Sequence, residues 1–462
     1  MAICLMLASC ATKAQVRHKA MDSAFDGGDF IAMADSLKRN SKKLYGENGA
    51  FLFHMDLGVL YHYSGQYSES GKHFQQAAEI YHDLFTRSVS NEAAALLTND
   101  NARPYRSKPY ELTTLHQFAA LNFMAAGDFD GALVESRKAQ LLFNEWERLG
   151  AKDGKYHTDG MFHLMSSLAY ERTDEPDNSL ISLYKSVDAY KKGPVALPPE
   201  VEGFAYDRLM AGDRENDVTA LGISSKGGAN KWDAQQGQAE IVVVAYAGRG
   251  PNLVEENWYG TYIQGGRLQI HTRPKEGVRL TLEIPAPPLP AGKGGPGQKV
   301  DVKISLPKLR NDVSRTSHFT GYLEDSDDTV ESVVVNDFEK QAKKALDDAW
   351  GDIVARTVVR MIVRTLAANE TKNRTQTSSP LLNVLTSVAT DIATDQMERA
   401  DTRMCFLLPQ RIHVMRFPVE PGTHSVTLNA HDRSGRIMEH KTFDNIEVKR
   451  GEKKVLLHHS FR

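Results

Sequence analysis

The three cysteines are the first residues of this chain whose side chains could do chemistry. Cys4 and Cys10 lie within the first ten residues, so Cys405 is the only cysteine left for the rest of the 462-residue chain. A disulfide framework or a cysteine-rich metal site needs several cysteines that fold together, and this distribution excludes both. Cys405 has no catalytic signature around it, and we expect a buried thiol rather than a nucleophile.

Cys10 ends an apolar segment whose last residues read Leu7-Ala8-Ser9-Cys10. This order resembles the bacterial lipobox, in which small residues admit a signal peptidase and the cysteine thiol is acylated. The resemblance implies that residues 1–9 are a lipoprotein signal peptide and that acyl chains such as palmitate attach at Cys10. Ala11 stands where lipoproteins of the inner membrane carry Asp, which implies the outer membrane, on its periplasmic side or at the cell surface. The alternative is a cysteine that follows small residues by chance.

Two further motifs resemble ligand sites but lack the context that those sites need. Gly292, Gly294 and Gly297 have the spacing of a dinucleotide-binding loop, yet a proline tract precedes them and a strand pattern follows, where a strand and then a helix are required. The sixteen histidines include no pair on a helix at the zincin spacing. We therefore predict no cofactor, no metal ion and no catalytic residue.

Two charged features stay open as ligand sites. Arg249 lies between Gly248 and Gly250, where its guanidinium could bind a carboxylate or phosphate; an exposed arginine in a tight turn is the alternative. An acidic cluster could hold calcium, although it lacks the glycine and the spacing of a known calcium loop, and a solvated turn is the alternative. The cluster comprises Glu324, Asp325, Asp327, Asp328 and Glu331.

The composition narrows the classes of partner. With 56 basic and 59 acidic side chains the formal net charge is -3, so no strong positive field attracts nucleic acid. After the N-terminal segment no stretch reaches the ~18 uninterrupted apolar residues of a spanning helix. Attachment to a membrane therefore depends on Cys10.

Two segments of the N-terminal half follow the tetratricopeptide pattern of paired helices. In this pattern Gly58 allows a close helix crossing, and Tyr61 and Phe74 fill the space between the two helices. A bundle without repeats is the alternative. The first copy contains Leu57, Gly58, Tyr61, Gly65, Tyr67, Phe74, Ala77 and Ala78, and the second contains Ala119, Ala120, Phe123, Gly127, Phe129, Ala132 and Ala139.

Stacked helical pairs present a concave face to extended partners, so we expect envelope proteins to bind in this helical groove. His54 and His116 occupy equivalent positions in the two copies. We predict that both are exposed in the groove and contact the partner, with Arg249 as a third candidate contact.

The second half of the chain alternates between strand and helix patterns. Residues 241–246 form an apolar β-branched run, typical of a strand buried on both faces, and alternating residues predict strands at 278–284 and 300–306. The proline-rich and glycine-rich stretch at 285–297 between these two strands indicates a loop. Helical spacing then covers 335–399.

The last sixty residues again alternate in the manner of strands. Turns at Pro421-Gly422 and Gly451-Glu452 between these strands resemble those of the small PEGA-like β modules of bacterial surface proteins. Together with the lipobox, the run at 241–246 and the segment 400–409, they make the chain similar to a family of proteobacterial outer-membrane lipoproteins that contain tetratricopeptide repeats. The resemblance implies no particular activity.

The sequence therefore predicts an α+β multidomain protein, a non-catalytic envelope scaffold or adaptor that contacts the membrane through its lipid anchor. The alternative function is binding or processing of an envelope polymer, peptidoglycan or polysaccharide, with Arg249 and the acidic cluster in a cleft. The expected parts are a signal peptide at 1–9, a tetratricopeptide-like helical solenoid at 10–221, a linker at 222–238, a mixed β domain at 239–400 with a helical segment at 335–399, and a PEGA-like β-sandwich module at 401–462.

Replacing the acylated thiol tests the anchor. We expect Cys10→Ser to move the protein from the membrane fraction to the soluble fraction, because no other side chain can take the lipid. Fractionation of cells that carry each form measures this, with Cys4→Ser as the matched control. A Cys10→Ser protein that still sediments with outer membranes at high salt contradicts the anchor.

Overall fold

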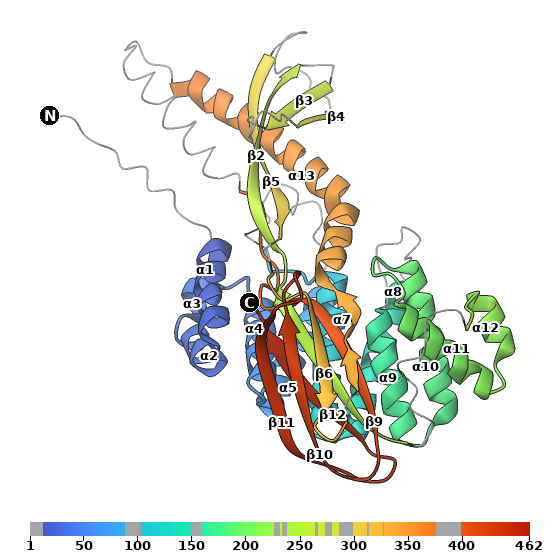
Figure 1. The fold of residues 1–462 in the computed structure, drawn as a ribbon. Coiled ribbons are helices and arrows are strands. Elements are labelled where there is room, and N and C mark those ends of the chain that lie inside the picture. Colours follow the sequence, from blue (N-terminus) through green and yellow to red (C-terminus); the bar gives the residue numbers. More distant parts are fainter. Residues whose placement is uncertain are drawn as a thin grey trace.

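Among the described residues, helices occupy the first half of the chain, and three sheets with one long helix occupy the second half (Figure 1). The mixed α and β composition and the helical N-terminal half agree with the sequence prediction. The computed structural model describes residues 13–87, 101, 103–148, 159–225, 232, 238–263, 267–272, 280–285, 299–311, 314–326, 328–375 and 399–462. Cys10, Gly292 to Gly297 and most of the expected linker lie outside the described residues.

Short turns join the helices of the first half into antiparallel pairs. Gly65 and Gly127 lie in two of these turns with φ of +75° and +81°, a conformation that glycine adopts without steric cost. The described helices are α1 (Lys13–Gly27), α2 (Phe30–Arg39), α3 (Ser41–Leu44), α4 (Ala50–Tyr63), α5 (Tyr67–Arg87), α7 (Pro109–Ala125), α8 (Phe129–Arg148), α9 (Gly160–Arg172), α10 (Pro176–Lys192), α11 (Pro199–Ala211) and α12 (Glu215–Leu221).

The pair α4 and α5 crosses closely at the glycine that the repeat pattern marks. A Cβ atom added at Gly58 would lie 2.5 Å from the ring of Phe74, so only glycine fits this crossing unless the ring moves. Phe74 is 1% exposed and Tyr61 is 5% exposed. The predicted roles of these three residues in packing are confirmed.

The strands that the structure describes form three four-stranded sheets. The central sheet has the order β12-β1-β9-β8, with β1 (Ala239–Arg249), β8 (Val333–Asp337), β9 (Pro409–Val419) and β12 (Lys453–Ser460). The outer sheet has the order β11-β10-β6-β7, with β6 (His318–Leu323), β7 (Thr329–Glu331), β10 (Gly422–His431) and β11 (Ile437–Val448). The arm sheet has the order β4-β3-β2-β5, with β2 (Asn252–Ile263), β3 (Arg267–Thr272), β4 (Thr281–Pro285) and β5 (Lys299–Arg310).

Strand β1 is buried on both faces, as its apolar run predicts. Val242, Val244 and Tyr246 point into one core, which they share with the helices. Alternate residues, such as Ile241 and Val243, point into a second core between the central and outer sheets. The body is therefore three layers, with helices on one face of the central sheet and the outer sheet on the other.

The layered core contradicts the domain boundary that the sequence placed at residue 400. β1 pairs in parallel with β12 and antiparallel with β9, so strands from both sides of residue 400 form one sheet. The strands of 401–462 are divided between two sheets, and β1 and β6 to β8 complete these sheets. The reason is that β1, an apolar strand, needs a hydrogen-bonded neighbour on each edge, and 239–400 supplies neither.

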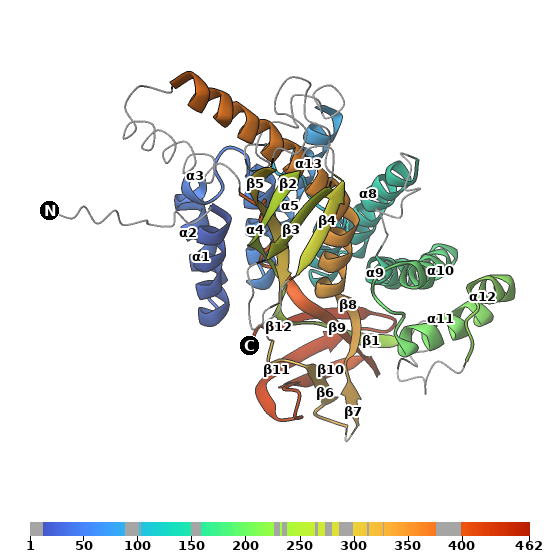
Figure 2. The same cartoon turned by 90° about the horizontal axis from the view of Figure 1, so that it is seen from above.

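An arm projects from the body (Figure 1). It consists of the arm sheet and α13 (Phe338–Thr375), which lies alongside that sheet (Figure 2). Trp258 and Ile304 of the sheet pack against Val358 of the helix. None of the described helices, α13 included, combines the length and the apolar character that crossing a membrane requires.

A buried ionic network fastens the central sheet to the helices. Glu240 on β1 accepts hydrogen bonds from Arg416 on β9 and, at 2.8 Å, from Lys453 on β12. Lys453 also lies 3.0 Å from Glu171 on α9. Burial by itself would raise the pKa of Glu240, but the charges of Arg416 and Lys453 hold it at about 2. The carboxylate is therefore ionised throughout the neutral range.

Glu240→Gln tests the stabilisation that this network supplies. Because the folded pKa lies below the ordinary value, the stabilisation is present above pH 4.5 and is lost as the pH falls toward 2. We expect the free energy of unfolding to fall by roughly 3 kcal/mol at neutral pH, and this difference should become smaller as the pH falls from 4.5 toward 2. Urea unfolding at several pH values measures it, with the exposed Glu447→Gln on β11 as control. A pH-independent difference would contradict the assignment.

Candidate functional site

The first helices of the pairs hold the chain's own central sheet. The Nε2 atom of His62 on α4 lies 2.6 Å from the hydroxyl of Tyr246 on β1, and its Nδ1 lies 2.7 Å from Oδ1 of Asn122 on α7. The hydroxyl of Tyr63 donates to the carbonyl of Leu407 at 2.8 Å. Burial lowers the pKa of His62 to about 4, so the imidazole is neutral at pH 7. This face of the helical half is thus occupied within the molecule.

The histidines predicted to contact a partner lie between the helices of each pair. Nδ1 of His54 on α4 is 3.0 Å from Nδ1 of His73 on α5. His116 on α7 is 5% exposed, and its Nδ1 lies 3.0 Å from Glu135 on α8. The two positions are equivalent, as the repeat pattern indicates, but they face the second helix of the pair. The prediction that His116 is exposed in the groove is wrong, and His54 is half-buried.

Arg249 is held by the N-terminal helix. Its Nη1 lies 3.6 Å from Asp22 on α1, and its guanidinium lies 5.2 Å from the centre of the Phe25 ring. Of the acidic cluster, Asp325 lies 3.6 Å from His424, and Glu331 belongs to β7 of the outer sheet. Among the residues that the structure describes, no group of three or more His, Cys, Asp or Glu side chains is placed to hold a metal ion.

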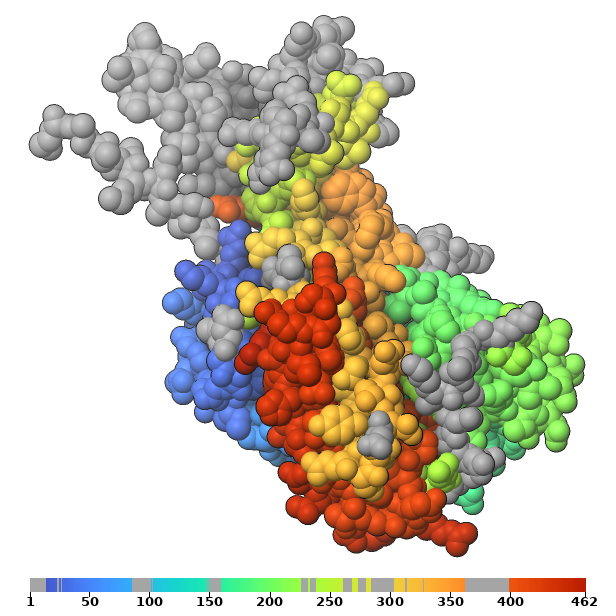
Figure 3. All heavy atoms as spheres, in the orientation of Figure 1, coloured from blue at the N-terminus to red at the C-terminus, as the bar shows by residue number. Residues whose placement is uncertain are grey.

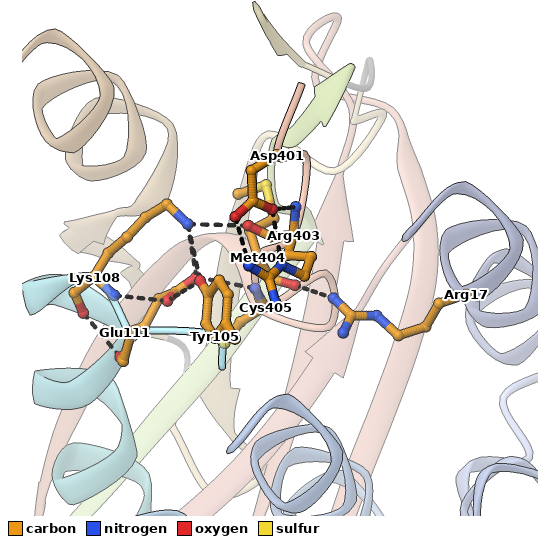
Figure 4. A network of polar contacts seen from close by, with 9 residues as sticks. Arg17, Tyr105, Lys108, Glu111, Asp401, Arg403, Met404 and Cys405 are labelled. Carbon is orange, nitrogen blue, oxygen red and sulfur yellow. Dashed lines mark hydrogen bonds and ion pairs between the residues drawn. The ribbon is translucent and has the colours of Figure 1, made fainter. Parts of the chain in front are cut away.

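A buried polar network joins the segment 400–406 to the start of α7 (Figure 4). Glu111 is fully buried and accepts hydrogen bonds from the backbone N–H of Lys108 at 2.9 Å, from the Tyr105 hydroxyl, and from the backbone N–H of Cys405 at 3.0 Å. The ammonium of Lys108 donates to the carbonyl of Arg403 at 3.1 Å. Glu111 therefore connects two segments that are 294 residues apart.

Arg403 forms the second half of this network. Its guanidinium binds both carboxylate oxygens of Asp401, at 2.9 and 2.8 Å, and donates to the carbonyl of Arg103 at 2.8 Å. Burial would raise the pKa of Asp401, but the hydrogen bonds and charge of Arg403 lower it overall. The guanidinium of Arg403 is thus bound to a carboxylate of the same chain.

Arg17 of α1 enters the network from the opposite side. It is 2% exposed, donates to the carbonyl of Met404 and lies 3.7 Å from Asp56. Burial raises the pKa of Asp56 to about 6, with Arg17 opposing the rise. Burial and the nearby Glu111 and Asp56 raise the pKa of the Cys405 thiol well above its usual value. This environment disfavours the thiolate form, and Cys405 is buried, as expected from the sequence.

A groove lies beside this network, where α5, α8 and the loop before α7 meet α13. Its volume is about 400 Å³. Aromatic and aliphatic side chains line it, among them Tyr81 and Leu84 of α5 and Trp146 of α8. The indole N–H of Trp146 donates to the Tyr81 hydroxyl at 3.2 Å. Charged groups complete the lining, with Arg106 and Lys108 from the loop and Asp348 and Asp352 from α13.

A smaller cavity of about 50 Å³ continues the groove along α13 and shares Pro109, Ala345 and Asp348 with it. Asp159, the N-cap of α9, lines this cavity and accepts hydrogen bonds from the side chains of Gln341 at 2.6 Å and Asn336 at 3.1 Å. Burial raises the pKa of Asp159 despite these donors.

Sequence reasoning did not find the groove residues. Tyr81 and Leu84 fall on the helical period of the first repeat copy, and Trp146 falls on that of the second, so core packing accounts for them equally well. Only the position of α13 against the helix pairs makes them neighbours. The segment 400–409, by contrast, is part of the family resemblance given above, and Asp401, Arg403 and Cys405 of this segment belong to the polar network.

Comparison with known proteins gives little further information. No protein-family model matches the chain. No curated protein matches it. Among solved structures, the apo form of RapI matches with 13% identical residues and a TM-score of 0.33, over 47% of this chain. The match covers 55% of RapI, so the chain spans about half the length of that protein.

Glu111→Gln tests whether the polar network stabilises the fold. The amide keeps one acceptor oxygen but turns an N–H₂ group toward donors. We therefore expect the free energy of unfolding to fall by roughly 2 kcal/mol. Urea unfolding measures the loss, and Glu79→Gln on the exposed face of α5 is the matched control. Equal stabilities of the two variants would show that Glu111 does not connect α7 to the segment 400–406.

Proposed function

We propose that this chain is a non-catalytic lipoprotein of the bacterial cell envelope, held in the outer membrane through Cys10, and that it acts as a protein-interaction scaffold. The helix pairs are tetratricopeptide-like repeats, a reading that the Gly58 crossing and the glycine turns support. The strands of the last sixty residues are a PEGA-like unit whose two layers are completed by strands from earlier in the chain.

The observation that carries this proposal is the groove between the helix pairs and α13. The inner face of the pairs holds the central sheet, so a partner has to bind elsewhere. The groove offers an apolar, aromatic lining with basic groups at one side and acidic groups on α13. Aromatic side chains with a charged rim are the composition of protein-binding sites, and the volume fits a few side chains of a partner.

The polar groups beside the groove support a non-catalytic role. Glu111 and Asp401 each accept several hydrogen bonds, and burial raises the pKa of the Cys405 thiol. General acid or base catalysis needs a group with hydrogen-bonding capacity left for substrate, and nucleophilic catalysis needs a thiolate. Neither requirement is met by these three residues.

The alternative function, binding or processing of an envelope polymer, requires Arg249 and the acidic cluster to lie in one cleft. Arg249 is instead engaged with α1, and Asp325 is engaged with His424 on β10. These contacts engage the two features with different elements, α1 and β10, which favours the scaffold over polymer binding.

A charge placed in the groove tests the proposal. Leu84→Asp puts a carboxylate among apolar side chains, and we expect binding of an envelope partner to fall by roughly tenfold or more, the effect of losing a binding hot spot. The matched control is Leu141→Asp on α8, since Leu141 is 71% exposed and does not line the groove. Pull-down from envelope extracts with quantitative mass spectrometry compares them. Identical partner sets for both variants would place the binding surface elsewhere.

A further inference from the structure

An exposed basic surface lies beside the start of α1. We propose that this surface binds anionic phospholipid headgroups next to the Cys10 anchor, so that the protein rests on the membrane in one orientation. The surface consists of Lys19, Arg39, Lys42 and Lys43, all of them exposed, and we call it the basic patch. The proposal rests on the lipid anchor proposed above.

The sequence concentrates positive charge here. Residues 38–43 contain four basic side chains and no acidic one. Lys38 is engaged with the hydroxyl of Tyr61, which leaves three lysine and arginine side chains of this segment, together with Lys19, to form the patch. Among the described side chains of residues 13–49, Asp29, Asp35 and Glu47 are exposed and acidic, and Asp22 is engaged with Arg249. Asp29 precedes α2, at the opposite end of that helix from Arg39, so basic side chains are in excess at the patch.

The fold brings the patch to the anchored end of α1. A turn at Gly28, with φ of +68°, reverses the chain, and α2 runs back along α1. The guanidinium of Arg17 lies 5.1 Å from the centre of the Tyr45 ring, directly after α3. Arg17 is about one helical turn from Lys13, the first residue of α1. Lys42 and Lys43 therefore lie near the end of α1 from which Cys10 is reached.

The anchor cannot act as a long tether, because α1 is fixed to the body. Arg17 and Met21 are buried, Asp22 pairs with Arg249, and the ring of Phe25 packs 4.8 Å from that of Phe461. Cys10 precedes Lys13 by three residues, which span at most about 10 Å when fully extended. Acyl chains on Cys10 therefore hold the start of α1 within about that distance of the headgroups.

The physical consequence is attraction between the patch and a negatively charged lipid surface. The screening length at physiological salt is about 8 Å, so the patch is attracted where it comes within about that distance of the headgroups, and the short link from α1 to Cys10 permits such an approach. Figure 3 shows the α1 to α3 group, in blue, at the margin of the molecule. Basic residues beside an acyl chain are a known way to strengthen a lipid anchor.

Vesicle flotation with the full chain carrying Cys10→Ser tests the patch without the lipid. We expect binding to phosphatidylcholine vesicles that contain phosphatidylglycerol, and no binding to vesicles of phosphatidylcholine alone. Lys42→Glu combined with Lys43→Glu should weaken that binding by roughly tenfold or more. The control is the charge-matched pair Lys449→Glu and Arg450→Glu, in the turn between β11 and β12. This double variant should bind as strongly as the Cys10→Ser protein that carries no further change. Thermal melting confirms that both double variants fold.

Three outcomes overturn the proposal. The Cys10→Ser protein does not bind anionic vesicles, it binds neutral vesicles equally well, or the two double variants lose the same amount of vesicle binding. The anchor is judged separately, by mass spectrometry of acyl chains on Cys10 in the unmodified protein. An unacylated Cys10 refutes the proposed anchor, whereas the vesicle result alone decides the patch.

Discussion

The burial of β1 on both faces is the constraint on which the rest of the structure depends. A strand of this kind needs a hydrogen-bonded neighbour on each edge and an apolar layer on each face. β9 and β12 supply the edges, and the helix pairs and the outer sheet supply the layers. Four parts of the chain are therefore tied to one strand, and the helical half belongs to the same core. For this reason the central sheet covers the inner face of the helix pairs, where the sequence predicts an external partner.

Local patterns in the sequence predicted the elements well. The helix pairs, the crossing at Gly58, the doubly buried strand and the helix that begins near 338 all follow from spacing and residue type, which act over short distances. The pairing of β1 with β12 could not be predicted, because a parallel neighbour more than two hundred residues away leaves no mark on the hydrophobic period of either strand. The boundary at 400 failed for that reason.

The same limit applied to the candidate site. His54 and His116 were correctly recognised as equivalent, but their direction depends on which side of each first helix is covered by the sheet, and periodicity does not report this. Arg249 is a strand-end arginine, as its sequence context predicts, and its carboxylate partner is Asp22 of the N-terminal helix α1, which spacing along the chain does not indicate. The groove needs α13 in place against α5 and α8 before it exists at all.

The distance along the chain between β1 and its parallel neighbour also affects how the protein folds. Glu240 and Lys453 are separated by 213 residues, so the core cannot close until both have been synthesised. Chains with such distant contacts fold slowly, since loop closure costs entropy before any contact offsets it. Until that moment the helix pairs expose the apolar side that β1 later covers, which is a surface for aggregation. The partly folded chain is therefore more exposed to aggregation than a free-standing helical bundle of equal length would be.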